Sequence, residues 1–314
     1  MIRFLVVRFG LILLTLLVVS IAIFLVTEVL PGDVAWHILG QGATPESLEA
    51  IREKLDLNRP AHIRYLSWIG NALQGDLGDS YVQSRPVVDV VKSRLFNSAV
   101  LAAFAFLVSV PTAVATGVWA GVRRNSVGDQ LVSTISLVGI SLPEFVTGVL
   151  LIVIFASTLH VLPSSSVLLP GTNPLTRPSI LILPTITLTG VLFAYIMRMT
   201  RANVIEVMQT NYVRTAMLKG LPMRRIIFRH VIPNAMLPTI SVIAINIGWM
   251  FGGLIIVENV FAYPGLGRLL LIAIQSRDVP LLQALALLIA VTYSISNLLA
   301  DLSYGLLNPR IRTS

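Results

Sequence analysis

The sequence contains no cysteine, which excludes disulfide bonds, a thiolate nucleophile and thiolate metal ligands. It is also poor in charge, because only 12% of its 314 residues are charged, whereas soluble domains carry roughly 25%. Hydrophobic residues make up 55% of the chain. This balance is typical of proteins that cross a membrane several times.

Several motifs of enzymes are missing as well. The phosphate-binding loop Gly-x4-Gly-Lys-Ser/Thr is absent, because no lysine follows a glycine. There is no His-Glu-x-x-His pair and no Gly-x-Ser-x-Gly turn, and the histidines are scattered. We therefore expect no enzyme activity, no catalytic residue, no cofactor and no metal site in this chain.

Six stretches are apolar enough to cross a bilayer, which takes about 20 residues. Five of them contain no charged residue, and the sixth is interrupted only by Glu144. The sequence therefore predicts an all-α polytopic membrane protein with six transmembrane helices. The stretches are residues 9–27, 95–122, 130–159, 178–197, 231–257 and 279–300.

The net charge of +8 comes from basic residues between these stretches, so membrane topology explains it better than nucleic-acid binding. Of the 23 Lys and Arg residues, 13 lie in four short segments: 1–8, 122–130, 198–234 and 308–314. Positive loops stay in the cytoplasm. We predict a multi-pass membrane protein with both termini cytoplasmic. Without a small-x-small cleavage site, the first stretch is expected to remain uncleaved.

The chain divides into four expected parts. Residues 1–30 form the N-terminal end and the first span, and residues 31–94 form an extracytoplasmic helical cap with balanced charge. Residues 95–308 form a five-helix core, and residues 309–314 form a cytoplasmic tail. In the cap, Thr44 is expected to cap a helix over residues 46–55.

A second cap helix is expected over residues 62–73, with an apolar face. The next four residues, Gly75-Asp76-Leu77-Gly78, predict a turn. The expected face consists of Ile63, Leu66, Ile69 and Leu73.

Prolines and small residues punctuate the spans. Pro143 is expected to kink or break its helix, as are Pro111 and Pro184. Glu144 beside it is an intramembrane carboxylate and thus a candidate pathway residue, although it could equally face a water-filled vestibule. Small residues at four-residue spacing indicate close helix packing. These are Ala113, Gly117 and Gly121 in one span and Gly248 and Gly252 in another.

The segment 198–234 between two spans holds seven Lys or Arg residues and one acid. Two short helices are predicted here, separated by Gly220, which can adopt the left-handed conformation that ends a helix. Pro233 is expected to keep Ile232 out of the helix and to mark a break before the next span. The first helix is too short to be stable alone, so it packs against its own neighbours, docks in a groove of another protein or rests on anionic lipid headgroups.

This segment resembles the EAA loop of permeases of binding-protein-dependent ABC importers, Glu-Ala-Ala-x3-Gly-x9-Ile-x-Leu-Pro. Gly220, Ile232 and Pro233 occur at that spacing, as does Ala216. The chain departs from the pattern at Arg214, Thr215 and His230, which replace Glu, Ala and Ile. The run from Tyr212 to Ala216, followed by Lys219-Gly220-Leu221, is similar to the variant in the dipeptide, oligopeptide and nickel branch.

Further motifs of that branch occur in order along nearly the whole chain. The chain departs from that branch at Asn308, because the residue before the final Pro-Arg is commonly an Asp. The motifs are Leu30-Pro31-Gly32-Asp33, Gly75-Asp76-Leu77-Gly78, Ser141-Leu142-Pro143, Tyr263-Pro264-Gly265-Leu266-Gly267-Arg268 and Pro309-Arg310-Ile311-Arg312.

The resemblance implies a type I ABC-importer permease fold in a bacterial or archaeal inner membrane, and four kinds of partner. These are a second, similar permease subunit, expected as a heterodimer, two ABC ATPase subunits that bind ATP and Mg²⁺, an extracytoplasmic substrate-binding protein and the lipid bilayer. The short helix before Gly220 would then contact an ATPase. The residues implied in coupling are Tyr212, Arg214, Thr215, Ala216, Lys219, Gly220 and Leu221.

The resemblance also implies the function: import of dipeptides or oligopeptides by alternating access. Nickel, glutathione and oligosaccharides are alternative cargoes of the same branch. Pathway or gate residues are expected at Pro143, Glu144, Pro264, Gly265 and Gly267, although the last three are equally explained by a rigid turn. A secondary transporter driven by an ion gradient is the competing class, but no internal repeat is visible.

Overall fold

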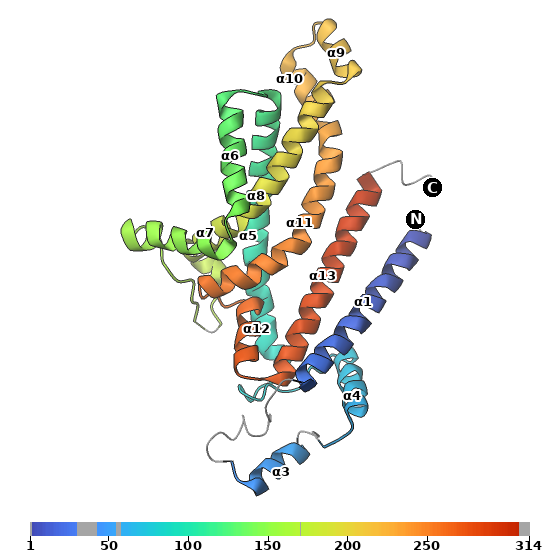
Figure 1. Ribbon diagram of the computed structural model, residues 1–314, viewed down its shortest axis with the longest axis vertical. Coiled ribbons are helices and arrows are strands. Elements are labelled where there is room, and N and C mark those ends of the chain that lie inside the picture. Colours follow the sequence, from blue (N-terminus) through green and yellow to red (C-terminus); the bar gives the residue numbers. More distant parts are fainter. Residues whose placement is uncertain (1, 30–42, 55–57, 170, 308–314) are drawn as a thin grey trace. The chain divides into compact units, whose positions relative to one another are not determined.

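The computed structural model describes residues 2–29, 43–54, 58–169 and 171–307 (Figure 1). Within these ranges the chain forms helices and turns and no strand, which confirms the all-α class. Contacts within the chain divide it into two units. One comprises Met1–Phe96 and Gly265–Ser294, and the other comprises Asn97–Pro264 and Ile295–Ser314.

Some expectations fall outside the described residues or differ from this division. The motif at residues 30–33, Leu55, Asn308 and the tail at 309–314 lie outside the described residues. The expected four-part division of the chain stays a prediction, and the contacts of residues 265–294 group them with the N-terminal part of the chain.

In the described part of the chain, five helices are long and apolar enough to cross a membrane. A sixth crossing requires two helices, α6 (Val127–Ser141) and α7 (Glu144–Leu151), with a π-helical extension to α7, Ile152–Thr158. The six predicted spans correspond to these elements. The five single helices are α1 (Ile2–Val29), α5 (Val87–Val122), α8 (Ser179–Met208), α11 (Ile232–Val260) and α13 (Val279–Leu307).

The apolar stretch over residues 130–159 is thus broken at Pro143, as expected. The chain bends by 108° between α6 and α7, and Leu142 just before Pro143 is extended, with φ −88° and ψ 125°. A proline disfavours the helical conformation of the residue before it, and Leu142 adopts the extended alternative at the break. Pro111 and Pro184, in contrast, lie inside the continuous helices α5 and α8.

The first unit contains α3 (Pro45–Lys54) and α4 (Ala61–Leu73). Thr44 caps α3 as predicted, because its Oγ1 accepts a hydrogen bond from the backbone N–H of Ser47 at 3.2 Å. The helix α4 is also confirmed, but its packed face is not the predicted one. Of that face, Ile63, Leu66 and Leu73 are 43%, 63% and 83% exposed.

Aromatic side chains hold α4 against α1 instead. The ring of Phe24 in α1 lies 5.4 Å from Tyr65 and 6.3 Å from Trp68, measured between centroids. The Tyr65 hydroxyl also hydrogen-bonds Ser20 at 2.9 Å. Large rings with a polar group bury more area and can bond a hydroxyl, so they outweigh the aliphatic stripe.

The first unit also contains α12 (Leu266–Gln275), which the sequence analysis did not predict. It packs on the start of α5 and on α13, with Val87, Leu269 and Leu285 fully buried. Asp278 before α13 accepts hydrogen bonds from the Ser80 hydroxyl and the Tyr81 N–H. Burial, and then the negative charge of Asp278, raises the pKa of Tyr81.

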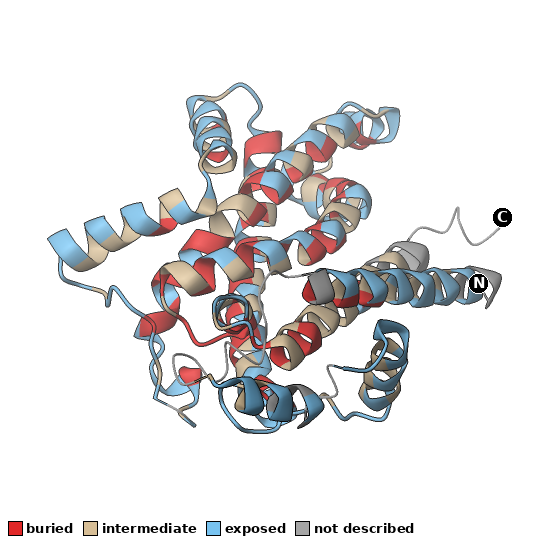
Figure 2. Ribbon diagram, turned by 60° about the horizontal axis from the view of Figure 1, so that its bottom comes forward, coloured by how far each residue is buried: buried red, intermediate tan, exposed pale blue. Residues whose placement is uncertain are grey.

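In the second unit α8 packs along both α6 and α11 (Figure 1). The expected small-residue face of α5 lies against α8, because a Cβ added at Gly117 would stand 2.7 Å from the Met197 carbonyl oxygen. Gly252 on α11 faces open space, so its expected packing is not seen within this chain. In contrast, α1 of the first unit, which begins at the N-terminus, is exposed along most of its length, as expected for a lipid-facing helix (Figure 2).

Candidate functional site

The basic segment between α8 and α11 contains two short helices, as predicted (Figure 1). The first, α9 (Asn211–Leu218), turns one face to the ends of the long helices. Val213 and Ala216 on that face are 0% and 7% exposed. They share a buried cluster with Val204 of α8 and Ala235 of α11. The cluster attaches α9 to both helices that flank it.

The other face of α9 is open. Tyr212, Arg214 and Thr215 are exposed, as are Lys219 and Gly220 after the helix. Leu218 at the end of α9 is 81% exposed. Of the seven residues implied in coupling, only Ala216 is buried and Leu221 half-buried, both in the cluster described above.

Gly220 ends α9 in the manner predicted. Its φ is +72°, a backbone conformation that residues other than glycine rarely adopt. The Leu221 N–H donates to the Ala216 carbonyl at 3.3 Å, and the Gly220 N–H donates to the Met217 carbonyl at 2.9 Å. These two bonds form a Schellman motif, which satisfies carbonyls at the end of a helix.

The expected break at Pro233 is absent. Helix α10 (Met223–Ile226) continues through a π-helical segment, Ile227–Val231, directly into α11. Ile232 is helical, with φ −55° and ψ −50°. The wider π-helical turn before Pro233 explains why the chain stays helical, because it relieves the clash between a proline ring and the preceding turn. The basic segment is thus joined to α11 by continuous helix.

Glu144 begins α7 directly after Pro143, and its side chain is half-buried. Its carboxylate lies against the backbone of α11, because a Cβ added at Gly253 would stand 2.5 Å from Glu144 Oε1. Gly253 was not singled out from the sequence, although the pair Gly252-Gly253 in an apolar helix was a visible signal. Glycine at residue 253 is what leaves room for the carboxylate.

The other predicted gate residues occur at the turn after α11. The Pro264 carbonyl accepts a hydrogen bond from Asn97 Nδ2 at 2.8 Å, and the Tyr263 hydroxyl donates to the Asn97 carbonyl at 2.8 Å. Burial, and then the charge of Glu258, raises the pKa of Tyr263. Gly265 is the N-cap of α12 and Gly267 lies in its first turn, and both are buried.

Glu144 rests on Gly253 of α11, whereas Pro264 is bonded to Asn97 of α5. Within the described ranges, no group of three or more His, Cys, Asp or Glu side chains gathers in metal-binding geometry.

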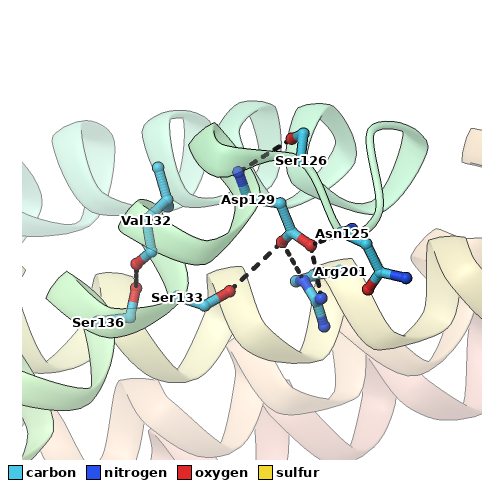
Figure 3. Close-up of polar contacts among 7 residues, drawn as sticks. All are labelled: Asn125, Ser126, Asp129, Val132, Ser133, Ser136 and Arg201. Carbon is cyan, nitrogen blue, oxygen red and sulfur yellow. Dashed lines mark hydrogen bonds and ion pairs between the residues drawn. The ribbon is translucent and has the colours of Figure 1, made fainter.

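One ion pair was missed altogether. Arg201 of α8 donates two hydrogen bonds to the carboxylate of Asp129 in the first turn of α6, at 2.5 and 2.7 Å (Figure 3). The two residues are 72 positions apart in the chain. The only sequence signal was an acid three residues after Ser126, a serine that could cap the helix.

Comparisons with known proteins agree with this architecture. Residues 113–313 match the family described as "Binding-protein-dependent transport system inner membrane component", and residues 1–102 match its N-terminal counterpart. The chain is 38% identical over 298 residues to the glutathione transport system permease protein GsiC of Escherichia coli, covering 95% of both chains. It is 38% identical over 296 residues to the probable peptide ABC transporter permease protein y4tP of Sinorhizobium fredii, covering 94% of both.

Proposed function

The chain belongs to the family of inner membrane components of binding-protein-dependent transport systems, and from this premise we propose that α9 is the contact through which an ATPase subunit drives it. The family implies a substrate-binding protein and ATPase subunits as partners. The chain itself is a multi-pass permease of the inner membrane.

The geometry of α9 carries this proposal. A helix of eight residues is not stable alone in water, and here the buried Val213 and Ala216 hold it on the long helices. Its outer face presents Leu218 and Tyr212 beside Arg214. Exposed apolar side chains on an amphipathic helix suit a groove of a partner protein.

Motion of α9 reaches the membrane by two routes. Helix α9 follows α8 directly in the chain, and the shared cluster joins it to α11. An ATPase that closes around ATP would therefore shift α8 and α11 together. Alternating access follows if nucleotide and the loaded binding protein each bind the outward-open state more tightly than the inward-open state. The chain contributes no catalysis, and ATP and Mg²⁺ belong to the ATPase subunits.

The assembly contains a second, similar permease subunit, and we propose a heterodimer. The basic segment with α9 lies in the cytoplasm together with both termini, because 13 of the 23 basic residues fall in those loops. Helices α3 and α4 then lie outside the membrane on the opposite side, where the binding protein docks.

The proposed cargo is a short peptide or glutathione, itself a tripeptide, because the relatives are named for peptide and glutathione transport. Glu144 is the proposed pathway residue, with Pro143 setting its position. Its half-buried carboxylate at the break between α6 and α7 suits a cationic amine. Pro264, Gly265 and Gly267 are proposed to hold the turn of an outer gate.

The cognate binding protein tests the cargo. We expect dipeptides, oligopeptides or glutathione to raise its melting temperature by mass action. Nickel and oligosaccharides serve as the comparison ligands. Stabilisation by one of these two alone would assign the chain to another cargo of the same family.

Gly220 tests the role of α9. Gly220→Val forces a β-branched residue into φ +72°, a conformation that costs roughly 1–2 kcal/mol for an L-residue. We expect membrane insertion to persist while uptake by the reconstituted transporter is lost. Gly171→Val is the matched control, because Gly171 has φ +79° and equally open surroundings. Normal uptake per ATP hydrolysed by Gly220→Val would refute the coupling role.

A further inference from the structure

The carboxylate of Asp129 is the hub of the turn between α5 and α6 (Figure 3). Besides the two bonds from Arg201, it accepts the Asn125 N–H at 2.9 Å. The Ser126 hydroxyl accepts the Asp129 N–H at 3.2 Å, which caps α6. Asn125 has φ +64°, so the carboxylate also holds the turn in a conformation that few residues adopt.

A second set of contacts fixes the same turn from α5. A Cβ added at Gly128 would stand 2.3 Å from the ring of Trp119, so the edge of the indole points at the α6 backbone. The Arg123 guanidinium lies over that ring, 5.4 Å from its centroid. The first turn of α6 is thus held by α5 on one side and by Arg201 on the other.

The ion pair between Asp129 and Arg201 is bidentate and almost dry at the acid. The side chain of Asp129 is 1% exposed and that of Arg201 is 28% exposed. Two parallel bonds between planar groups restrict both sliding and rotation of the paired helices. Apolar packing, in contrast, provides no such directional bonds between neighbouring helices.

Stability alone does not explain a pair in this position. Replacing a buried ion pair by apolar side chains is often neutral or stabilising, whereas such pairs are best attested as devices that fix register. Arg201 lies two helical turns before the end of α8, after which α9 begins. The pair therefore connects the helix that carries α9 to the first half of the bent span.

We propose that the pair of Asp129 and Arg201 is a positioning contact that makes α6 follow α8 when α9 is displaced. The pair transmits the displacement through α6 to the break at Pro143, where α7 begins with Glu144. Neither residue touches the cargo or the ATPase. The proposal rests on α9 as the driven element.

The first test replaces the pair by apolar side chains, Asp129→Leu with Arg201→Met, in the complete reconstituted transporter. We expect assembly and ATP hydrolysis to persist, and uptake per ATP hydrolysed to fall roughly fivefold or more, the range typical of coupling between sites. Arg198→Met is the matched control, because it removes an exposed cation one turn earlier on α8. A wild-type ratio in the apolar pair would overturn the proposal.

Arg201→Lys decides the matter if the apolar pair fails to assemble. A lysine keeps the charge but lacks the planar fork, so we expect an intermediate ratio of uptake to hydrolysis. A purely structural role would lower uptake and hydrolysis in equal proportion and leave that ratio unchanged, and this outcome would also sink the proposal. If α9 were not the driven element, the Gly220→Val variant would show a normal ratio of uptake to ATP hydrolysis, so this outcome is distinguishable from a failure of the ion-pair proposal.

A distance measurement gives a second readout. The chain has no native cysteine, so spin labels can be placed at Val127→Cys on α6 and Ala202→Cys on α8, both exposed. We expect double electron–electron resonance to give the same distance between the labels in the resting and the ATP-trapped transporter. In the variant with Asp129→Leu and Arg201→Met, we expect this distance to change on trapping. A change in the otherwise native chain would show that α6 does not follow α8.

Discussion

At the residue scale, glycines on the faces of the spans have unequal roles in this protein. Gly252 faces open space, whereas its neighbour Gly253 accommodates the carboxylate of Glu144. Gly117 has a backbone carbonyl of α8 at the place where a side chain would begin. A substitution therefore has a different consequence at each position: displacement of a flexible side chain at residue 253, and separation of two helices at residue 117.

Gly253→Ala tests whether the position of Glu144 matters for transport. The new methyl group would displace the carboxylate, and because that group ends a flexible side chain, we expect little change in melting temperature. Uptake should fall several-fold, as it should in Glu144→Gln. Since both changes act on the same group, the double variant should be no worse than either single one.

The matched control is Gly252→Ala, which places the same methyl group on α11 in open space. Uptake and melting temperature should stay unchanged in this variant. Fully additive losses in Gly253→Ala with Glu144→Gln, measured as initial uptake rates, would argue that Gly253 acts independently of the carboxylate. No loss in either single variant would remove Glu144 from the pathway.

At the scale of elements, the structure differs most from expectation where a helix begins, ends or chooses a packing face. The segment from Met223 to Val260, where a break was expected at Pro233, is continuously helical. At Pro143, in contrast, the expected break occurs, and the chain forms two helices bent by 108°. Each of these prolines lacks the N–H that would donate a backbone hydrogen bond. The neighbouring residues decide the outcome, because a π-helical turn precedes Pro233 whereas an extended residue precedes Pro143.

The choice of packing face on α4 follows the same rule. An aliphatic stripe was present in the sequence, but Tyr65 and Trp68 pack on α1 and leave that stripe exposed. Periodicity predicts that a helix has an apolar face. It does not predict which neighbour covers a face when aromatic residues lie on the other side.

At the scale of the whole molecule, each partner assignment depends on the side of the membrane on which a loop lies. Because the chain has no native cysteine, single introduced thiols can report that side. Leu218→Cys on α9 and Leu73→Cys on α4 are matched sites, because the native side chains are 81% and 83% exposed. We expect a membrane-impermeant maleimide added from outside to label Leu73→Cys.

Leu218→Cys should react only after the inner membrane is permeabilised, because positive loops remain in the cytoplasm. Labelling is read as a mass shift on the purified chain. Reaction of both thiols from the same side would contradict the predicted topology. Labelling of Leu218→Cys in intact cells would also remove α9 as a contact for an ATPase.

The sequence by itself determined the membrane class, the approximate spans and the two short helices of the basic segment, the first of which ends at Gly220. These features depend on local quantities: the length of an apolar run, the position of charges and the left-handed backbone that glycine allows. The cap on α3 was predictable for the same reason, because Thr44 and Ser47 are three residues apart. The resemblance to permeases, carried by short motifs in order, supplied the function.

Tertiary structure alone decided which distant residues meet. Asp129 and Arg201 are separated by 72 positions, and Glu144 and Gly253 by more than 100. No periodicity or local propensity encodes such pairs, because each depends on how whole helices align after they pack. The chain thus specifies its helices through nearby residues, and it specifies its ion pair and carboxylate site only through the alignment of α6 and α7 with α8 and α11.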